Sequence, residues 1–208
     1  MYSKLKFELH TSTQNGIATL NTLFAEAGSG FRNRYDATNA LKKKQMDKVA
    51  HAVETAIIKK EITAKDIMRG KLHLFIAVHP YDKSSDVDNY SIISKWVTDA
   101  LEGIRIEIKE DGTLKYLGYY DSHSKKINRA GLPGQPFLNN DNFNNIIDIH
   151  AFYAGKYKRK PYIDFVWTSD WDEYDHLLMT MSKLSNALTT KETAESQRKR
   201  AEYLAKKF

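Results

Sequence analysis

Apolar and polar residues alternate in several short runs of the chain, and this period of two predicts β-strands. Residues 4–10 place Leu5, Phe7 and Leu9 on one side. The apolar run 72–78 predicts a second strand, which ends at His79-Pro80 because proline has no N–H to donate to a sheet. Further strands are predicted at 104–108, 114–120, 146–153 and 162–167. We expect two hairpins, one turning at Glu110-Asp111-Gly112-Thr113 and one with its tip at 155–160.

Apolar residues spaced three and four apart predict the helices. One helix is expected from Asp36 to about Lys60, and a second follows Asp88 and carries Trp96, Val97 and Leu101 on one face. A strongly amphipathic helix is predicted from about 170 to 188, where Thr189-Thr190 should end it before a charged helix at 192–207. Residues 21–35 and 122–136 have the glycine-rich or polar composition of loops.

These elements predict an α+β fold with a mixed β-sheet, two helices packed on the sheet, and a helical C-terminal extension. We expect one domain over residues 1–169, with an insertion at about 103–136, and the extension over 170–208.

Composition narrows the class of partner. The net charge of +6 favours a polyanionic partner, and the absence of cysteine excludes disulfides and thiolate metal sites. No apolar run is long enough to span a bilayer, so we expect a soluble, intracellular protein. The seven histidines are scattered without the spacing of zinc ligands.

Two aspartates, Asp86 and Asp88, stand between the strand at 72–78 and the following helix. Residues two apart in an extended chain point to one side, so both carboxylates can face one ion, and Mg²⁺ prefers such oxygen ligands. Asp88 occupies the expected N-cap position, and Lys95 and Asp99 follow near the same helical stripe. A solvated turn with a helix cap is the alternative interpretation. The chain also contains a second Asp-x-Asp, Asp170-Trp-Asp172, to which we assign no function.

The segment Asp86-Val-Asp88-Asn89, followed by Lys95 and by Asp99-Ala100-Leu101, resembles the signature of the RusA-type Holliday-junction resolvases. The spacing from Asn89 to Lys95 is about three residues longer than is usual in that family, which is close to one helical turn. After the insertion, Asn140-Asp141 stands where family members carry paired acids, with the first acid replaced and the second kept.

The resemblance implies a Mg²⁺-dependent endonuclease, with Mn²⁺ as an alternative ion, that resolves branched DNA in recombination and repair. It implies that Asp86, Asp88 and Asp141 hold the metal and that Lys95 assists catalysis. We rank Asp141 first, Asp121 second and Asp111 last as the third carboxylate, because Asp141 precedes a strand of the expected core sheet whereas Asp111 stands in a turn. The resemblance also implies a homodimer encoded by a phage or prophage and acting in the host cytoplasm. The alternative is a catalytically impaired protein of the same fold that binds branched DNA without cutting it.

Three basic segments are candidates for contact with DNA phosphates. They are the loop before the first helix, the lysine run in that helix and the 155–160 tip, with the candidate residues Arg32, Arg34, Lys43, Lys44, Lys156, Lys158, Arg159 and Lys160. For each segment a solvated surface or a plain linker is the alternative interpretation. The sequence does not choose between these alternatives.

Overall fold

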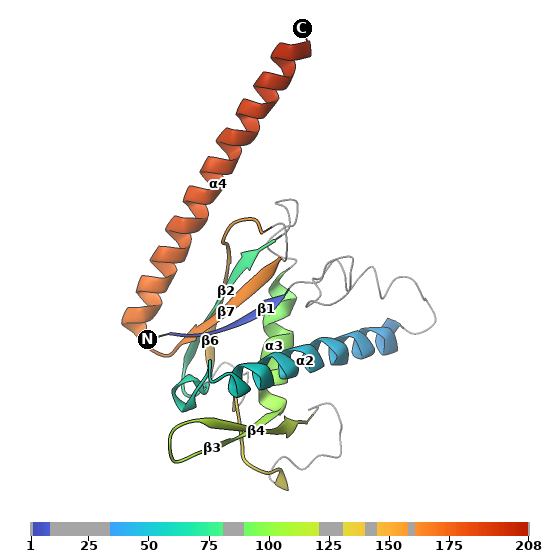
Figure 1. The fold of residues 1–208 in the computed structure, drawn as a ribbon, viewed down its shortest axis with the longest axis vertical. Coiled ribbons are helices and arrows are strands. Elements are labelled where there is room, and N and C mark those ends of the chain that lie inside the picture. The colour runs from blue at the N-terminus through green and yellow to red at the C-terminus, as the bar shows by residue number, and fades with distance from the viewer. Residues whose placement is uncertain are drawn as a thin grey trace.

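The computed structural model describes residues 2–8, 34–80, 90–120, 131–139, 145–157 and 161–207, with the backbone alone at 34–38, 91, 200 and 203–207. It confirms the α+β class: a mixed four-stranded sheet carries helices on both faces, and a smaller three-stranded sheet lies at one end (Figure 1). The strands of the large sheet are β1 (Ser3–Glu8), β2 (Leu72–His79), β6 (Ile146–Tyr153) and β7 (Tyr162–Thr168). The long helices are α2 (Arg34–Ile58), α3 (Ser91–Gly103) and α4 (Trp171–Lys207), and a 3₁₀ turn, η1, spans Ala64–Asp66.

The large sheet has the order β1-β7-β2-β6. β7 pairs antiparallel with both β1 and β2, whereas β6 pairs parallel with β2. The predicted hairpin between the last two strands is therefore wrong, because β2 lies between β6 and β7. β6 and β7 run in opposite directions on either side of β2, so the chain crosses from β6 to β7 past the end of β2.

The core lies between this sheet and helices α2 and α3. Alternate residues of β2, among them Leu74, Ile76 and Val78, point into this core, and Leu5 and Phe7 of β1 join them as the alternation predicts. α3 contributes Ile93, Trp96, Val97, Ala100 and Leu101, all at most 2% exposed. α2 begins at Arg34, two residues before the predicted start, so the expected loop ends earlier.

The predicted insertion forms the small sheet. β3 (Ile104–Ile108) and β4 (Leu114–Tyr119) make the expected hairpin, whose turn contains Gly112 with φ +77°, a conformation that favours glycine. The expectation of a loop throughout 122–136 is wrong at its end, because β5 (Gln135–Pro136) pairs with β3. Proline is tolerated there because β5 lies at the edge of the sheet.

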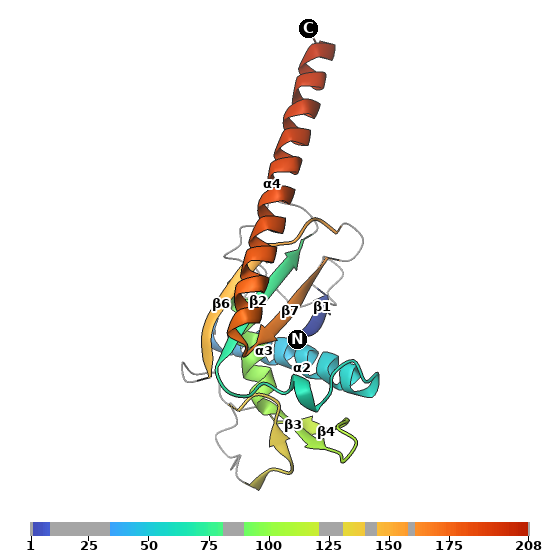
Figure 2. The ribbon, with the colours of Figure 1, turned by 90° about the vertical axis from the view of Figure 1, so that its left-hand side faces the viewer.

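α4 is one continuous helix, so the predicted break at Thr189-Thr190 is wrong. Thr190 Oγ1 donates to the Asn186 carbonyl (2.9 Å) and Thr193 Oγ1 donates to the Thr189 carbonyl (2.8 Å). The hydroxyls of Thr190 and Thr193 are thus satisfied within the helix. The first turns of α4 pack Tyr174 and Leu177 on the outer face of the sheet. The remainder runs past the sheet and extends away from it (Figures 1 and 2).

Candidate functional site

The elements that flank the Asp-x-Asp segment in the sequence are the strand and the helix that the sequence predicts. β2 ends at His79, and α3 begins at Ser91 with Tyr90 at its N-cap position. Asp86, Asp88 and Asn89 themselves lie outside the described residues. The expectation that Asp88 caps the helix is wrong, because Tyr90 occupies that position. Lys95 therefore lies in the second turn of α3 despite its longer separation from Asn89.

Lys95 is held by a carboxylate one turn further along the helix. Its ammonium nitrogen lies 2.7 Å from Asp99 Oδ1, while Lys42 of α2 lies 2.6 Å from Asp99 Oδ2. The Asp99 side chain is only 7% exposed, the Lys42 side chain 20% and the Lys95 side chain 55%. One buried carboxylate thus fixes two cations where α2 meets α3, and the Lys95 ammonium remains accessible to a phosphate.

The sequence predicts DNA contacts for Lys43 and Lys44 and indicates no separate role for Lys42, the first residue of the same lysine run. Lys43 and Lys44, the predicted DNA contacts, are exposed on the outer side of α2. Lys42 is instead directed toward α3 by the 100° rotation between successive helical residues. The run of three lysines alone does not distinguish among its members; the apolar positions Met46, Val49 and Val53 fix which face of α2 is buried and provide the missing signal.

The two segments that flank the third predicted metal ligand are anchored elsewhere. Asp141 lies outside the described residues, between Leu138, whose N–H donates to the Leu101 carbonyl, and Asn145, whose carbonyl accepts from the Leu72 N–H. One of these hydrogen bonds is at the C-terminal end of α3 and the other at the start of β2. The Asp-x-Asp segment instead precedes the N-terminal end of α3, and about 15 Å of helix separates Ser91 from Leu101. A metal site shared by Asp141, Asp86 and Asp88 therefore stays a prediction.

Of the two lower-ranked candidates for the third metal ligand, Asp111 and Asp121, the structure describes Asp111. Asp111 Oδ1 accepts hydrogen bonds from the Thr113 N–H (2.9 Å) and the Thr113 hydroxyl (2.6 Å), and these bonds lower the pKa of Asp111. This geometry confirms its turn role. Asp121 lies outside the described residues. In the second Asp-x-Asp, Asp170 Oδ1 accepts from the N–H groups of Asp172 and Glu173, so this pair caps the start of α4.

The basic segment after β6 lies against the end of β2. The Ala154 N–H donates to the Val78 carbonyl (2.8 Å) and the Tyr157 N–H to the Pro80 carbonyl (2.9 Å). Lys156, between them, lies 3.8 Å from Glu192 of α4. The predicted contacts Arg32, Lys158, Arg159 and Lys160 lie outside the described residues, and Arg34 is the first residue of α2. The sheet order therefore brings one predicted DNA-binding segment to the strand end from which the Asp-x-Asp segment departs.

Polar groups also gather beneath the first turns of α4. His73 Nδ1 lies 3.0 Å from both oxygens of Asp148, and His150 Nε2 lies 3.6 Å from Asp148 and 3.3 Å from the Tyr174 hydroxyl. Burial and the neighbouring Asp148 raise the pKa of Tyr174. Across the described part of the chain, no three histidine or carboxylate side chains are arranged to hold a metal ion. This cluster seats α4 on the sheet.

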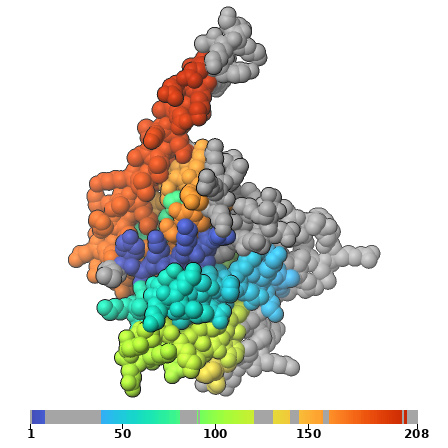
Figure 3. Space-filling model, in the orientation of Figure 1, coloured from blue at the N-terminus to red at the C-terminus, as the bar shows by residue number. Residues whose placement is uncertain are grey.

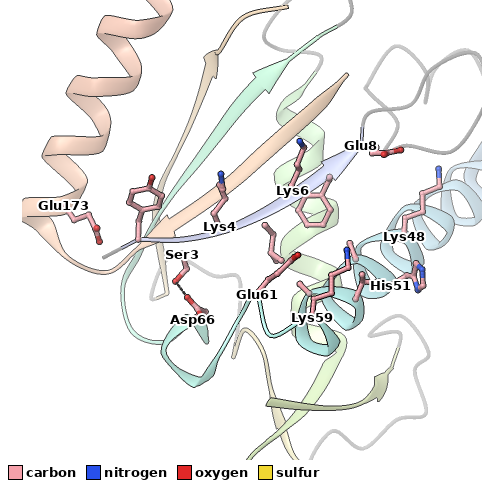
Figure 4. A pocket seen from close by; sticks show the side chains of 16 residues that line it. Ser3, Lys4, Lys6, Glu8, Lys48, His51, Lys59, Glu61, Asp66 and Glu173 are labelled. Carbon is pink, nitrogen blue, oxygen red and sulfur yellow. Dashed lines mark hydrogen bonds between the residues drawn. The ribbon is translucent and has the colours of Figure 1, made fainter. Parts of the chain in front are cut away.

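A groove of about 1150 Å³ runs between the edge strand β1 and α2 (Figures 3 and 4). β1 forms one wall, from which Lys4 and Lys6 project away from α2, and Lys48, His51 and Lys59 of α2 line the other. Four carboxylates share the lining: Glu8, Glu61, Asp66 and Glu173. Asp66 is occupied by hydrogen bonds from Ser3 Oγ and from Thr63. The groove mixes both signs of charge, so charge alone selects no class of ligand for it.

Comparison of the chain with family models, with curated proteins and with solved structures found no match. Among the described helices, none has both the length and the apolar character that crossing a membrane requires. The functional assignment therefore rests on the sequence motif and on what the fold places around it.

Proposed function

We propose that the protein is a metal-dependent endonuclease that hydrolyses phosphodiester bonds in branched DNA, four-way junctions in particular. The observation that supports the proposal is the position of the basic crossover at the end of β2, the strand that the Asp-x-Asp segment follows in the sequence. The crossover is bonded through Ala154 and Tyr157 to the last residues of that strand. The Asp-x-Asp segment is Asp86-Val-Asp88-Asn89. Cations that hold a phosphate backbone and carboxylates that hold a metal are both needed at a nuclease site.

The donor set fits a hard divalent cation. Asp86, Asp88 and Asp141 offer carboxylate oxygens, and the chain has no cysteine that would favour a softer metal. Mg²⁺, or Mn²⁺ in its place, supplies polarisation of the scissile phosphate and a lowered pKa for an attacking water. Asp86, Asp88 and Asp141 are the residues that would hold and orient this ion.

Lys95 supports the same reaction from α3. Its ammonium is oriented by Asp99 and its side chain is 55% exposed, so Lys95 can approach a phosphate while it keeps its ion pair on the helix. A cation there stabilises negative charge that develops on the phosphate. Lys156 and the lysines and arginine that follow it in sequence would hold the neighbouring backbone.

Resolution of a four-way junction requires two symmetric cuts, which a C₂ homodimer with two such sites can make. We accordingly propose a homodimer that acts on recombination and repair intermediates in a bacterial cytoplasm, encoded by a phage or prophage. These finer assignments rest on the family resemblance.

The first prediction concerns the metal-binding carboxylates. Asp88→Asn should abolish Mg²⁺-dependent nicking of an end-labelled junction and leave junction binding equal or tighter, because it removes charge that repels phosphate. Ca²⁺ should support binding but not cleavage, because its looser coordination positions the water poorly. The matched control is Asp172→Asn, in the Asp-x-Asp that caps α4. Wild-type nicking by Asp88→Asn would remove that residue from the site, and junction binding by the wild-type protein without paired nicks would favour the non-cutting alternative.

The second prediction concerns the basic crossover. Replacing Lys158 and Lys160 by glutamine should reduce the slope of log affinity against log salt by roughly two units, because each phosphate contact releases about one counterion. Fluorescence anisotropy with a labelled junction over a salt series measures this slope. An unchanged slope would return the segment to the solvated-surface interpretation.

A further inference from the structure

The outer face of β1 carries cations and an aromatic ring. Because side chains alternate along a strand, Leu5 and Phe7 enter the core while Tyr2, Lys4 and Lys6 point to the opposite face. Figure 4 shows Lys4 and Lys6 projecting to the same side of β1. The Lys4 side chain is 51% exposed and Tyr2 is 48% exposed. This row is open to a ligand along the edge of the sheet.

The neighbouring strands continue the row with aromatic rings. The Lys6 ammonium lies 3.6 Å from the centre of the Tyr162 ring, and the His79 ring stacks on Tyr162 with centroids 4.2 Å apart. The Tyr157 ring stands edge-on to Tyr162 at 5.4 Å and is 47% exposed. Three tyrosines and two lysines from β1, β7 and the crossover therefore form one continuous surface, which we call the open face.

α4 covers the other half of this side of the sheet. Its residues Tyr174, Leu177, Leu178 and Met181 pack on Phe75, Val166 and Phe152, near the middle of β2, β7 and β6. Figure 2 shows α4 running in front of β6 and β2, with β1 to one side. The open face is thus a distinct surface beside the part of the sheet that α4 covers.

Charge complementarity decides the class of partner. Asp164, 18% exposed, lies 3.7 Å from the Lys4 ammonium and 4.0 Å from His79, so it orders these groups. The accessible groups are the two lysines and the exposed rings of Tyr2 and Tyr157, while Tyr162 supports them between Lys6 and His79. The chain adds Lys158-Arg159-Lys160 immediately after Tyr157. Lysines attract phosphates, and exposed rings stack on bases, which are available only where they are unpaired.

We infer that the open face, formed by Tyr2, Lys4, Lys6, Tyr157 and Tyr162, binds an unpaired nucleic-acid strand and leads it to the end of β2. The inference rests on the proposed function, for which it names how the substrate is held. The hydrogen bond from the Tyr157 N–H to the Pro80 carbonyl joins the open face to the end of β2, after which the Asp-x-Asp segment follows in the sequence.

The test measures binding of a fluorescein-labelled oligothymidine of about 20 nucleotides by anisotropy, in EDTA so that no cleavage occurs. The double variant Lys4→Gln/Lys6→Gln should lower the salt slope by about 1.4, at about 0.7 per phosphate contact on a single strand. Tyr157→Ala should weaken binding about tenfold, and Tyr157→Phe, which keeps the ring, should bind like the wild type. Lys109→Gln/Lys115→Gln, on the distant β3–β4 hairpin, is the matched control.

Three results would overturn the inference: oligothymidine affinity unchanged in Lys4→Gln/Lys6→Gln, equal losses in Tyr157→Ala and Tyr157→Phe, or equal losses in the hairpin control. Unfolding midpoints equal to the wild type show that each variant folds. Nicking of a junction in Mg²⁺ is measured separately on the same proteins. Nicking without any dependence of oligothymidine binding on the open face refutes this inference alone, whereas face-dependent binding without nicking refutes the proposed nuclease alone.

Discussion

The buried Asp99 carboxylate between α2 and α3 pairs with two lysines, so substitutions here can distinguish an effect on stability from an effect on DNA cleavage. Asp99→Asn removes the partner of two lysines that the structure places 2.6 and 2.7 Å away. The pair with Lys95 is an i,i+4 pair whose lysine side chain is 55% exposed, and it contributes about 0.3–0.5 kcal/mol. The pair with Lys42 dominates, because removal of one member of a buried pair leaves an uncompensated charge and costs about 3–5 kcal/mol.

Lys42 keeps one fifth of its side chain exposed, so we take the lower end of that range, about 3 kcal/mol, for Asp99→Asn. For a chain of this length, such a loss lowers the midpoint of thermal unfolding by roughly 6–12 °C. Lys42→Met should cost less, about 2 kcal/mol, because Lys95 still accompanies the carboxylate. Lys95→Met should cost about 0.5 kcal/mol or less, yet should abolish nicking if Lys95 acts at the phosphate.

Urea unfolding followed by tryptophan fluorescence gives the three free energies of unfolding, and Asp172→Asn, on the exposed first turn of α4, serves as the control. The order of losses, with Asp99→Asn largest and Lys95→Met smallest, is the decisive result. A loss of less than about 0.5 kcal/mol for Asp99→Asn, or equal losses for the two lysine variants, would refute the reasoning from burial.

Two further predictions test the fold around the site. Gly103→Ala should destabilise the protein by about 1–3 kcal/mol in urea unfolding, because the added methyl group would lie 2.7 Å from the Tyr119 ring, whereas Gly131→Ala, with open space around it, should change little. Burial lowers the pKa of His79 below its usual 6.5, so the unfolded chain takes up a proton first as the pH falls and stability decreases below about pH 6.5. His79→Gln should reduce this decrease between about pH 7.5 and about pH 5.5; an identical decrease in both proteins would contradict the assignment.

Local periodicity determined much of the fold. β2 and α3 were predictable because an apolar run closed by His79-Pro80 and a stripe with three- and four-residue spacing each suit one kind of backbone. The hairpin at Asp111-Gly112 was also predictable from the local sequence, because the Asp111 side chain accepts a hydrogen bond from the backbone of its own turn. The order of strand, Asp-x-Asp segment and helix, on which the proposed function rests, is a property of the sequence itself.

The order of the strands was decided only by the tertiary structure. β6 and β7 follow one another closely in the chain, and a short polar connection between two strands usually means a hairpin. Here β2 separates them, because β2 is a buried central strand and each of its two edges pairs with a neighbouring strand. This arrangement places the basic crossover at the end of β2, which local sequence preferences do not encode.

The role of each charged residue was likewise decided by packing. Three consecutive lysines look alike in the sequence, but the rotation of α2 against α3 turns only Lys42 toward Asp99. Two Asp-x-Asp segments also look alike, yet Asp170 caps α4 because its carboxylate meets free N–H groups at a helix start. Sequence determines which groups are present and which backbone conformation each segment favours, whereas the distances that give a charge its function arise only when the elements pack against each other.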